Sequence, residues 1–301
     1  MSGAANTTLL AGDWGSTNLR LFLMDAEGSV TATRQSPQGV RSLRPDQFRA
    51  AFEELAADLL DGATPAGILL CGMVGARQGW LEAPYAEAPA GAAEIAARFA
   101  RVETRWGPAW IAPGLIARRP DGRADMMRGE ETQILGAGAD GMIVTPGTHS
   151  KWARTEGGRI TAFTTYMTGE LFEVLKRHSM LGALIEDGPP DPAAFDLGVA
   201  RARTGEPLQS LLFSVRSEGL TGALPGPSLA SYLSGLLIGG EIAAGLAGAP
   251  GAAPALIGEP ALTSLYATAL AAFGLTPAPV IDGAAAVAAG LWRLWLERSF
   301  T

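Results

Sequence analysis

The feature that most constrains this chain is a pattern that occurs twice: a short apolar strand, a turn of glycine and hydroxyl residues, and a second strand. The first copy reads GDWGSTNLRLFLMD at 12–25, and the second reads IVTPGTHSKW at 143–152. Glycine lets a backbone approach a ligand closely, and backbone N–H groups bind phosphate oxygens. One such turn is equally well explained as an ordinary hairpin. Two in matching strand contexts favour two loops that grip one polyphosphate.

Strands and helices are predicted around both turns from apolar periodicity and turn residues. In the first half, strands are expected at 8–12, 19–24, 30–35 and 67–71, and a helix at 45–59. In the second half, strands are expected at 142–145, 151–155, 160–165 and 255–257, with a hairpin turn at Gly157 and Gly158. Helices are expected at 169–177, 196–203, 208–217, 228–246, 261–273 and 284–297. This mixture predicts α/β layers, and 301 residues suffice for two domains.

Composition excludes several classes of function. The formal charge of −7 argues against a broad nucleic-acid surface. Cys71 is the only cysteine and His149 and His178 are the only histidines, which excludes an intramolecular disulfide and a His-rich metal site. The segment at 1–15 lacks the pattern of a signal peptide, and the apolar run at 229–246 contains a glutamate and several glycines. We therefore expect a cytoplasmic protein in which that run is a buried helix.

A third turn follows the predicted strand at 255–257. Gly258 and Glu259 end the strand, and Pro260 can begin a helix at a position that needs no N–H. Helix starts of this kind are common, so the turn gains meaning only beside the other two. There, its glycine and the helix N-terminus could flank an adenosine.

These turns resemble one protein family when they are taken with three further segments: GMVGARQGW at 72–80, DMMRGEETQILGA at 125–137 and MTGELF at 167–172. The set is similar to the 2-dehydro-3-deoxygalactonokinase family of bacterial sugar-acid catabolism, over nearly the whole chain. That family belongs to the superfamily of actin, hexokinase and the Hsp70 ATPase domain. The resemblance implies an α/β protein with the two-domain actin-like ATPase (ribonuclease H-like) fold and an interdomain nucleotide cleft. The domains are expected at 1–138 and 139–301, with the last helix able to pack back on the first.

The activity that the resemblance implies is ATP- and Mg²⁺-dependent phosphorylation of 2-dehydro-3-deoxy-D-galactonate at its 6-hydroxyl, in D-galactonate catabolism. The implied partner is a small sugar acid, with no nucleic acid and no membrane, and a homodimer is left open. The fold alone also permits another actin-like sugar kinase or phosphatase, or a non-enzymatic nucleotide switch.

The resemblance also assigns ATP to the three turns. The residues are Asp13, Gly15, Ser16 and Thr17 for the first phosphate loop, Gly147, Thr148, Ser150 and Lys151 for the second, and Gly258 and Glu259 for the adenosine side. Asp13 is expected on the metal side, because a carboxylate there could hold Mg²⁺ through water. The alternative is that Asp13 and Ser16 only cap a hairpin.

Phosphoryl transfer also needs a carboxylate that accepts the proton of the hydroxyl. Kinases of the glycerol-kinase type carry an acidic residue where this chain has Thr145 and Pro146, so the base must come from elsewhere. The candidates are Asp125, Glu130 and Glu131. Asp125 is expected at the start of a helix, where hexokinase-like kinases have their catalytic aspartate. The alternative is that Asp125 only caps that helix and that one of the two glutamates is the base.

Arginine is the expected reader of the substrate carboxylate, because its fork makes two parallel charge-assisted hydrogen bonds. Arg77 and Arg128 lie in glycine-flanked segments and are the two candidates. Gln78 and His149 are further substrate-side candidates. The alternative for either arginine is a plain ion pair with a neighbouring glutamate.

Overall fold

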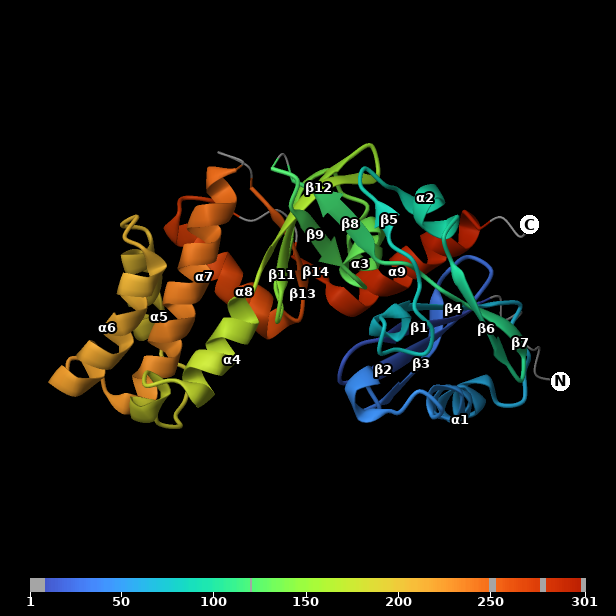
Figure 1. The fold of residues 1–301 in the computed structure, drawn as a ribbon, viewed down its shortest axis with the longest axis horizontal. Coiled ribbons are helices and arrows are strands. Elements are labelled where there is room, and N and C mark those ends of the chain that lie inside the picture. Colours follow the sequence, from blue (N-terminus) through green and yellow to red (C-terminus); the bar gives the residue numbers. More distant parts are fainter. Residues whose placement is uncertain (1–8, 120, 249–252, 277–279, 299–301) are drawn as a thin grey trace. The chain divides into compact units, whose positions relative to one another are not determined.

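The computed structural model describes residues 9–119, 121–248, 253–276 and 280–298. Contacts between Cα atoms divide the chain into two units (Figure 1). Unit 1 comprises Met1–Asp140, Ala153–Phe163 and Ile281–Thr301, and unit 2 comprises Gly141–Trp152 and Thr164–Val280.

The main sheet of unit 1 has the strand order β3-β2-β1-β4-β7-β6. Its strands are β1 Leu9–Trp14, β2 Leu19–Met24, β3 Val30–Ser36, β4 Ile68–Gly72, β6 Ala100–Thr104 and β7 Gly107–Ile111. The first three strands form an antiparallel meander, and β4 pairs with β1 in parallel. The short apolar runs that predicted β1, β2 and β4 reflect this layer, since side chains of these strands form the core with α1, Phe48–Leu60.

The second sheet repeats this order with strands β12-β11-β10-β13-β14. Its strands are β10 Gly141–Thr145, β11 Ser150–Glu156, β12 Arg159–Tyr166, β13 Ala255–Gly258 and β14 Val280–Asp282. In both sheets the order is third, second, first, fourth, and the first and fourth strands are parallel. The predicted hairpin turn at Gly157 and Gly158 is confirmed, and both glycines have positive φ.

Unit 1 also contains a three-stranded sheet that the sequence did not predict. Its order is β5-β8-β9, with β5 Ala86–Glu87, β8 Leu115–Arg118 and β9 Ala124–Met127. The remaining helices of the unit are α2 Ala92–Ala96, α3 Glu130–Ala137 and α9 Gly283–Leu296, with 3-10 turns η1 Val40–Ser42 and η2 Met73–Gly75. Helices α3 and α9 touch through glycine, because a Cβ at Gly136 would lie 1.8 Å from the Ala286 carbonyl oxygen.

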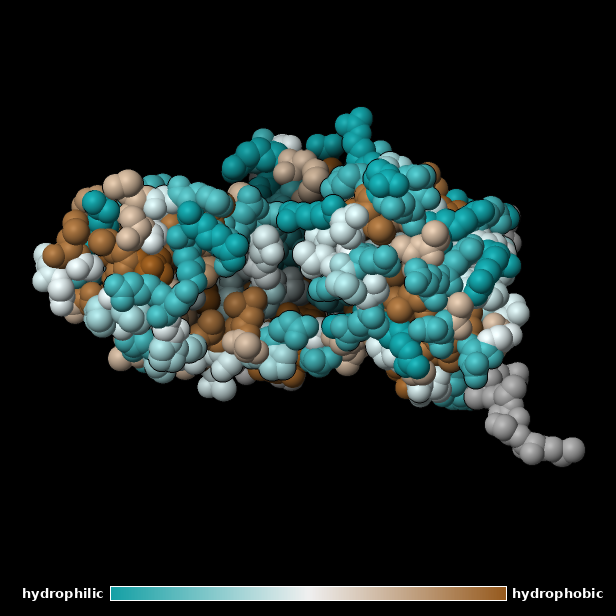
Figure 2. Space-filling model, turned by 90° about the horizontal axis from the view of Figure 1, so that it is seen from below, coloured by the Kyte–Doolittle hydropathy of each residue, from teal (hydrophilic) through white to brown (hydrophobic). Residues whose placement is uncertain are grey.

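The helices of unit 2 pack together (Figure 1). They are α4 Thr168–His178, α5 Pro192–Ala202, α6 Leu208–Thr221, α7 Leu229–Ala247 and α8 Pro260–Ala272, with 3-10 turns η3 Gly182–Leu184 and η4 Gly226–Ser228. Apolar side chains that stay exposed include Met180, and Phe213 and Leu220 of α6. Figure 2 shows hydrophobic residues, in brown, on the surface of the helices of this unit.

Helix α7 is the buried helix that the sequence predicted. Together with η4 it forms the one span among the described residues, Gly226–Ala247, that is long and apolar enough to cross a membrane, and 61% of an 18-residue window in it is buried inside the protein. Glycines bring α7 close to its neighbours. A Cβ at Gly235 would lie 2.1 Å from the Phe195 carbonyl oxygen of α5, and one at Gly245 would lie 2.6 Å from the Trp152 ring.

Candidate functional site

The first glycine-hydroxyl turn, residues 15–18, connects β1 to β2 and is held from one side. The carbonyl oxygens of Gly15, Ser16 and Thr17 accept hydrogen bonds of 3.1, 3.0 and 3.2 Å from backbone N–H groups of η1 and its N-cap. The C=O and N–H of a planar trans peptide point in opposite directions. The next N–H after each of these carbonyls therefore points away from η1, which makes three successive donors suited to an anion.

The backbone at Gly39 packs directly against the backbone of this turn. A Cβ at Gly39 would lie 2.2 to 2.3 Å from backbone atoms of Thr17, so no side chain fits at this position without moving the turn. The donors of the turn are thus placed by the backbone, and any side chain larger than hydrogen at position 39 would displace them.

Asp13 lies where β1 ends beside β4. The strands are parallel, with Asp13 opposite Cys71, and ligands of open α/β sheets bind outside the carboxyl ends of such strands. A Cβ at Gly72 would lie 3.2 Å from the Asp13 Oδ1 atom. Burial raises the pKa of Asp13 to about 6, which the Arg20 charge opposes and the Glu130 charge reinforces.

Glu131 is fully buried in the first turn of α3. Its Oε2 atom accepts a hydrogen bond of 2.7 Å from the Gly129 N–H, and its Oε1 atom accepts one of 2.8 Å from the Thr132 hydroxyl. Burial, together with the nearby Glu130 charge, raises its pKa to about 7. The carboxylate is enclosed by its own helix start, which leaves it little access to a ligand.

Glu130 begins α3 and is only partly buried, and its Oε2 atom accepts a hydrogen bond of 3.0 Å from the Arg128 N–H. The charge of Glu130 affects the pKa values of both Asp13 and Glu131, so the structure brings these three carboxylates together. Cys71 belongs to the same cluster, and burial raises the pKa of its thiol, with Asp13 and Glu131 reinforcing the shift. Sequence reasoning missed Cys71, whose only signal was its place at the end of a predicted strand.

Asp125 lies elsewhere in unit 1, and the prediction that it begins a helix is wrong. It is in strand β9, and its carboxylate forms an ion pair of 3.0 Å with Arg119. Alternation with buried neighbours is weak in this four-residue strand, whose only buried residue is Met127, so the sequence resembled a polar loop. The helix begins at Glu130 instead, because Gly129, with a φ of +104°, forms its N-cap.

The Arg128 guanidinium has buried donor nitrogens that find no acceptor among the described residues. Its Nη2 atom donates to the Ala83 carbonyl oxygen at 3.0 Å, and its guanidinium lies 4.4 Å from the centre of the Tyr85 ring. The Nε and Nη1 atoms are buried and have no hydrogen-bond partner among the residues that the structure describes. By contrast, Arg77 and Gln78 are exposed on the turn after η2.

The second glycine-hydroxyl turn follows β10 and rests against the first turn of α4. The Glu170 N–H donates to the Thr148 carbonyl oxygen at 3.0 Å, and the His149 imidazole contacts the Glu170 carboxylate. Thr148 is exposed. Lys151 is buried, and its ammonium donates to the His149 carbonyl oxygen at 2.8 Å.

The third turn lies beside the second. Strands β10 and β13 are parallel neighbours, and a Cβ at Gly258 would lie 3.7 Å from the Pro146 carbonyl oxygen. Glu259 is the N-cap of α8, and the predicted helix start at Pro260 is confirmed. Two of the sequence-predicted turns therefore meet at one sheet edge in unit 2.

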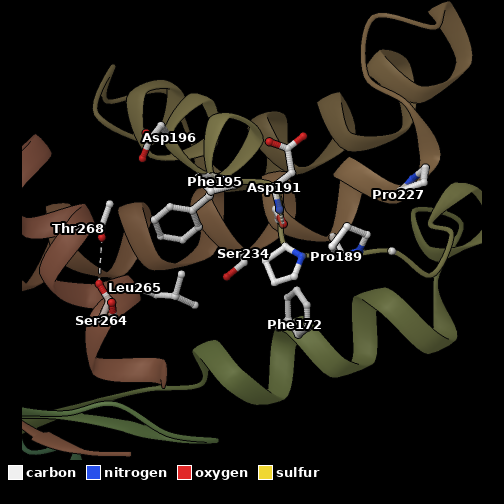
Figure 3. Close-up of a pocket in the computed structure, with 15 residues that line it drawn as sticks. Phe172, Pro189, Asp191, Phe195, Asp196, Pro227, Ser234, Ser264, Leu265 and Thr268 are labelled. Carbon is white, nitrogen blue, oxygen red and sulfur yellow. Dashed lines mark hydrogen bonds between the residues drawn. The ribbon is translucent and has the colours of Figure 1, made fainter. Parts of the chain in front are cut away.

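A pocket of about 460 Å³ opens among the helices of unit 2. Phe172 of α4, Phe195 of α5 and Leu265 of α8 converge on it (Figure 3). Hydroxyl groups of Ser234 and Thr268 also line it. Helix α8 begins at the third turn and the first turn of α4 contacts the second, so the pocket and the two turns share these helices.

Comparisons with known proteins agree on one family. The family model described as 2-keto-3-deoxy-galactonokinase matches residues 13–294. A probable 2-dehydro-3-deoxygalactonokinase of Rhizobium meliloti (strain 1021) is 40% identical over 93% of this chain and 94% of its own length. The 2-dehydro-3-deoxygalactonokinase of Escherichia coli (strain K12) is 38% identical over 78% of this chain and 79% of its own length. The crystal structure of a candidate 2-dehydro-3-deoxygalactonokinase from Sinorhizobium meliloti superposes with a TM-score of 0.87 at 38% identity, over 95% of this chain and 97% of that one.

Proposed function

The chain belongs to the 2-keto-3-deoxy-galactonokinase family, and from that premise we propose that it transfers the γ-phosphoryl group of ATP to the 6-hydroxyl of 2-dehydro-3-deoxy-D-galactonate. Its fold is the actin-like fold of ATPases and sugar kinases, as the sequence predicted. Kinase activity toward 2-dehydro-3-deoxygalactonate follows from the family, and neither the phosphatase nor the nucleotide switch is favoured. The acceptor hydroxyl and the role of each residue are proposals.

The observation that carries these roles is the cluster of Asp13, Glu130 and Glu131 in the unit that also holds the first turn of N–H donors. We assign the general base to Glu130, because Glu131 is enclosed and Asp125 is paired with Arg119. The 6-hydroxyl oxygen attacks the γ-phosphorus, the bond from that phosphorus to the oxygen of the departing ADP breaks, and Glu130 takes the hydroxyl proton.

Asp13 is proposed on the metal side. No group of three His, Cys, Asp or Glu side chains that could hold a metal ion occurs among the described residues. One carboxylate nevertheless fits Mg²⁺, which keeps several waters and takes its remaining ligands from substrate phosphates. The bound ion would neutralise charge on the phosphate oxygens. Asp13 must be ionised for this role, although burial raises its pKa to about 6.

Arg128 is the proposed reader of the substrate carboxylate. Its two buried unpartnered nitrogens are donors that a planar carboxylate can satisfy, whereas Arg77 lies exposed. Tyr85 and the Ala83 carbonyl oxygen hold the other side of the guanidinium. Gln78 and His149 stay predictions for the substrate side.

ATP is proposed to use all three turns. The N–H groups of the first and second turns bind phosphate oxygens, and the turn at Gly258 and Glu259 flanks the adenosine. The pocket among α4, α5, α7 and α8 suits adenine, a flat ring with apolar faces and a polar edge, because aromatic and aliphatic side chains line it together with hydroxyl groups. Ser150 and Lys151 of the second turn support its backbone from the buried side.

The test incubates the protein with ATP and Mg²⁺ and a panel of sugar acids, and follows ADP. We expect ADP release only with a 2-keto-3-deoxy acid, and phosphate on carbon 6 of the product by ³¹P–¹H correlation spectroscopy. Glu130→Gln should lower kcat by 100-fold or more (~10²–10⁴ for a general base), and Asp13→Ala should abolish turnover with the fold intact. ADP release that does not depend on the sugar acid would overturn the proposal.

We also propose that the protein acts in the cytoplasm on a small sugar acid, without a nucleic-acid or membrane partner. A homodimer stays a prediction, for which the exposed apolar side chains of α6 offer a surface.

A further inference from the structure

A buried chain of hydrogen bonds runs through unit 2 from α7 to the second turn. Glu241 of α7 is 3% exposed and accepts from the Trp152 indole at 2.8 Å and from the Tyr266 hydroxyl at 2.6 Å. The Tyr266 oxygen lies 2.9 Å from Ser150 Oγ, and Ser150 Oγ accepts from the Gly147 N–H at 3.4 Å. Three links therefore connect a carboxylate in the helical core to the backbone of the proposed phosphate loop.

The direction of the chain follows from which groups can donate. The Trp152 indole can only donate, and the Tyr266 hydroxyl donates its single proton to Glu241. The Tyr266 oxygen is then left to accept from the Ser150 hydroxyl, whose own oxygen accepts the Gly147 N–H. The Ser150 hydroxyl, which also hydrogen-bonds to Glu241, therefore links this buried pair to the Gly147 N–H.

Thr168 joins the same cluster from the first residue of α4. It is buried and hydrogen-bonds to Glu241 and Tyr266. A Cβ at Gly169, the next residue, would lie 2.5 Å from the Gly147 carbonyl oxygen. The cluster thus ties α7, α8 and the start of α4 to one turn, and nothing in the proposed chemistry requires so many polar groups inside this core.

We propose that Tyr266 and Glu241 are positioning residues for the nucleotide: through Ser150 they hold the second turn in the conformation that binds ATP phosphates. The role rests on the proposed function, since it presumes that ATP binds at this turn. It does not involve contact of either side chain with the nucleotide. A purely structural role would instead contribute to stability and leave nucleotide affinity unchanged.

Tyr232 provides a matched control within the same unit. It is fully buried like Tyr266, and its hydroxyl is also hydrogen-bonded, to Ser214 at 2.6 Å and to Arg201 at 2.5 Å. It belongs to a different apolar cluster from Tyr266. Tyr266→Phe and Tyr232→Phe each remove one buried hydroxyl and keep the ring, so they should affect folding comparably.

The experiment measures KM for ATP and for the sugar acid, ATP affinity by calorimetry, and amide hydrogen exchange of residues 147–151 without nucleotide. Tyr266→Phe should raise KM and Kd for ATP about five-fold or more, as expected for a lost hydrogen bond, and leave KM for the sugar acid within about two-fold. Exchange in the segment should accelerate. Tyr232→Phe should change none of these. Ser150→Ala, which removes the same link from the other end, should reproduce the effect of Tyr266→Phe.

Equal ATP affinities and equal exchange rates in the two tyrosine variants would overturn the positioning role, provided that the unchanged protein phosphorylates the sugar acid. If the unchanged protein itself fails to transfer phosphate, the proposed function fails, and the exchange measurement still tests the hydrogen-bonded chain. If Tyr266→Phe does not fold, Ser150→Ala decides between the two readings.

Discussion

Glu131 and Asp13 are carboxylates that the fold keeps partly protonated near neutral pH. Both have raised pKa values because burial disfavours their charged forms, and Glu130 adds a like charge. A cluster of this kind is typical of a functional site, because packing alone gives no reason to bury several carboxylates together. Because burying these carboxylates disfavours their charged forms, the stability of the protein depends on pH.

We predict that the free energy of unfolding falls as pH rises from about 4.5 to about 7. The Glu131 carboxyl has a pKa of about 7 in the folded protein against 4.5 as its ordinary value. The folded state therefore holds more protons than the unfolded state in this window, and stability is lost as pH rises through it, on the order of 3 kcal/mol for this group. Urea denaturation at pH 5 and pH 8 measures the difference, and Asp13 contributes with the same sign.

Glu131→Gln should reduce that difference because the variant side chain does not titrate. Glu54→Gln on the exposed face of α1 is the control and should leave the difference unchanged. An unchanged difference in Glu131→Gln would show that the Glu131 carboxyl is ionised throughout the window.

Arg128 leads to a prediction about substrate discrimination. Arg128→Ala should raise KM for the sugar acid strongly, since losing the partner of a buried carboxylate costs ~2–5 kcal/mol. KM for ATP should change little, and discrimination against the uncharged sugar analogue should fall. Steady-state kinetics with both sugars measures this. Arg77→Ala is the comparison, and the reverse ranking of the two variants would move the carboxylate site to Arg77.

At the scale of elements, the contact between α3 and α9 supports the carboxylate cluster. Gly290 of α9 faces α3 so closely that a Cβ there would lie 1.9 Å from the Thr132 carbonyl oxygen, one residue after Glu131. Gly290→Ala should therefore destabilise unit 1 by about 1–3 kcal/mol through overpacking and lower kcat by shifting the start of α3. Thermal denaturation and kinetics measure the two effects.

Ala289→Ser is the control for that variant, because Ala289 neighbours Gly290 on α9 but is exposed. It should leave both stability and kcat close to their original values. If Gly290→Ala is as stable and as active as Ala289→Ser, then the helices can separate without disturbing the site.

Most helices and eight strands of the two main sheets could be predicted from the sequence, because apolar residues and turn residues mark them, whereas β6, β7 and β14 were not predicted. The small sheet β5-β8-β9 could not be predicted either, since its strands have two to four residues and offer too few positions for alternation to be seen. Because strand β9 is equally short, the sequence wrongly predicted a helix start at Asp125. The turns at 15–18, 147–150 and 258–259 were visible because glycine, proline and hydroxyl residues mark turns by their own chemistry. The hydrogen-bonded chain from Glu241 to Gly147 was not, because its members are far apart in the sequence.

At the scale of the whole molecule, the residues proposed to bind the ligands are divided between the two units. Unit 1 holds the carboxylate cluster and Arg128, and unit 2 holds two turns and the pocket. The repeated strand–turn–strand pattern predicted the turns themselves, and the division of roles between the units stays a proposal. For the helices that surround the pocket, the sequence predicts only where they lie along the chain. Apolar periodicity does not say which side chains of different helices meet.

We predict that Leu265→Trp, which fills the pocket from α8, raises KM for ATP about ten-fold or more, as loss of ~1.4 kcal/mol or more of binding requires. KM for the sugar acid should stay the same, because Arg128 lies in the other unit. Kinetics with each substrate varied in turn provides the measurement. Leu220→Trp on the exposed surface of α6 is the control. Unchanged KM for ATP would place the adenine outside this pocket.

The discontinuity of unit 1 has a consequence for how the protein is made. Helix α9 is synthesised after all of unit 2, yet it covers α3, whose first turn buries Glu131. A nascent chain that has emerged only as far as unit 2 therefore has the first turn of N–H donors but lacks the cover of its carboxylates. Domains generally fold during synthesis in order from the N-terminus. Here unit 2 is synthesised in full before the last segment of unit 1, so it can fold while α3 still lacks its cover by α9.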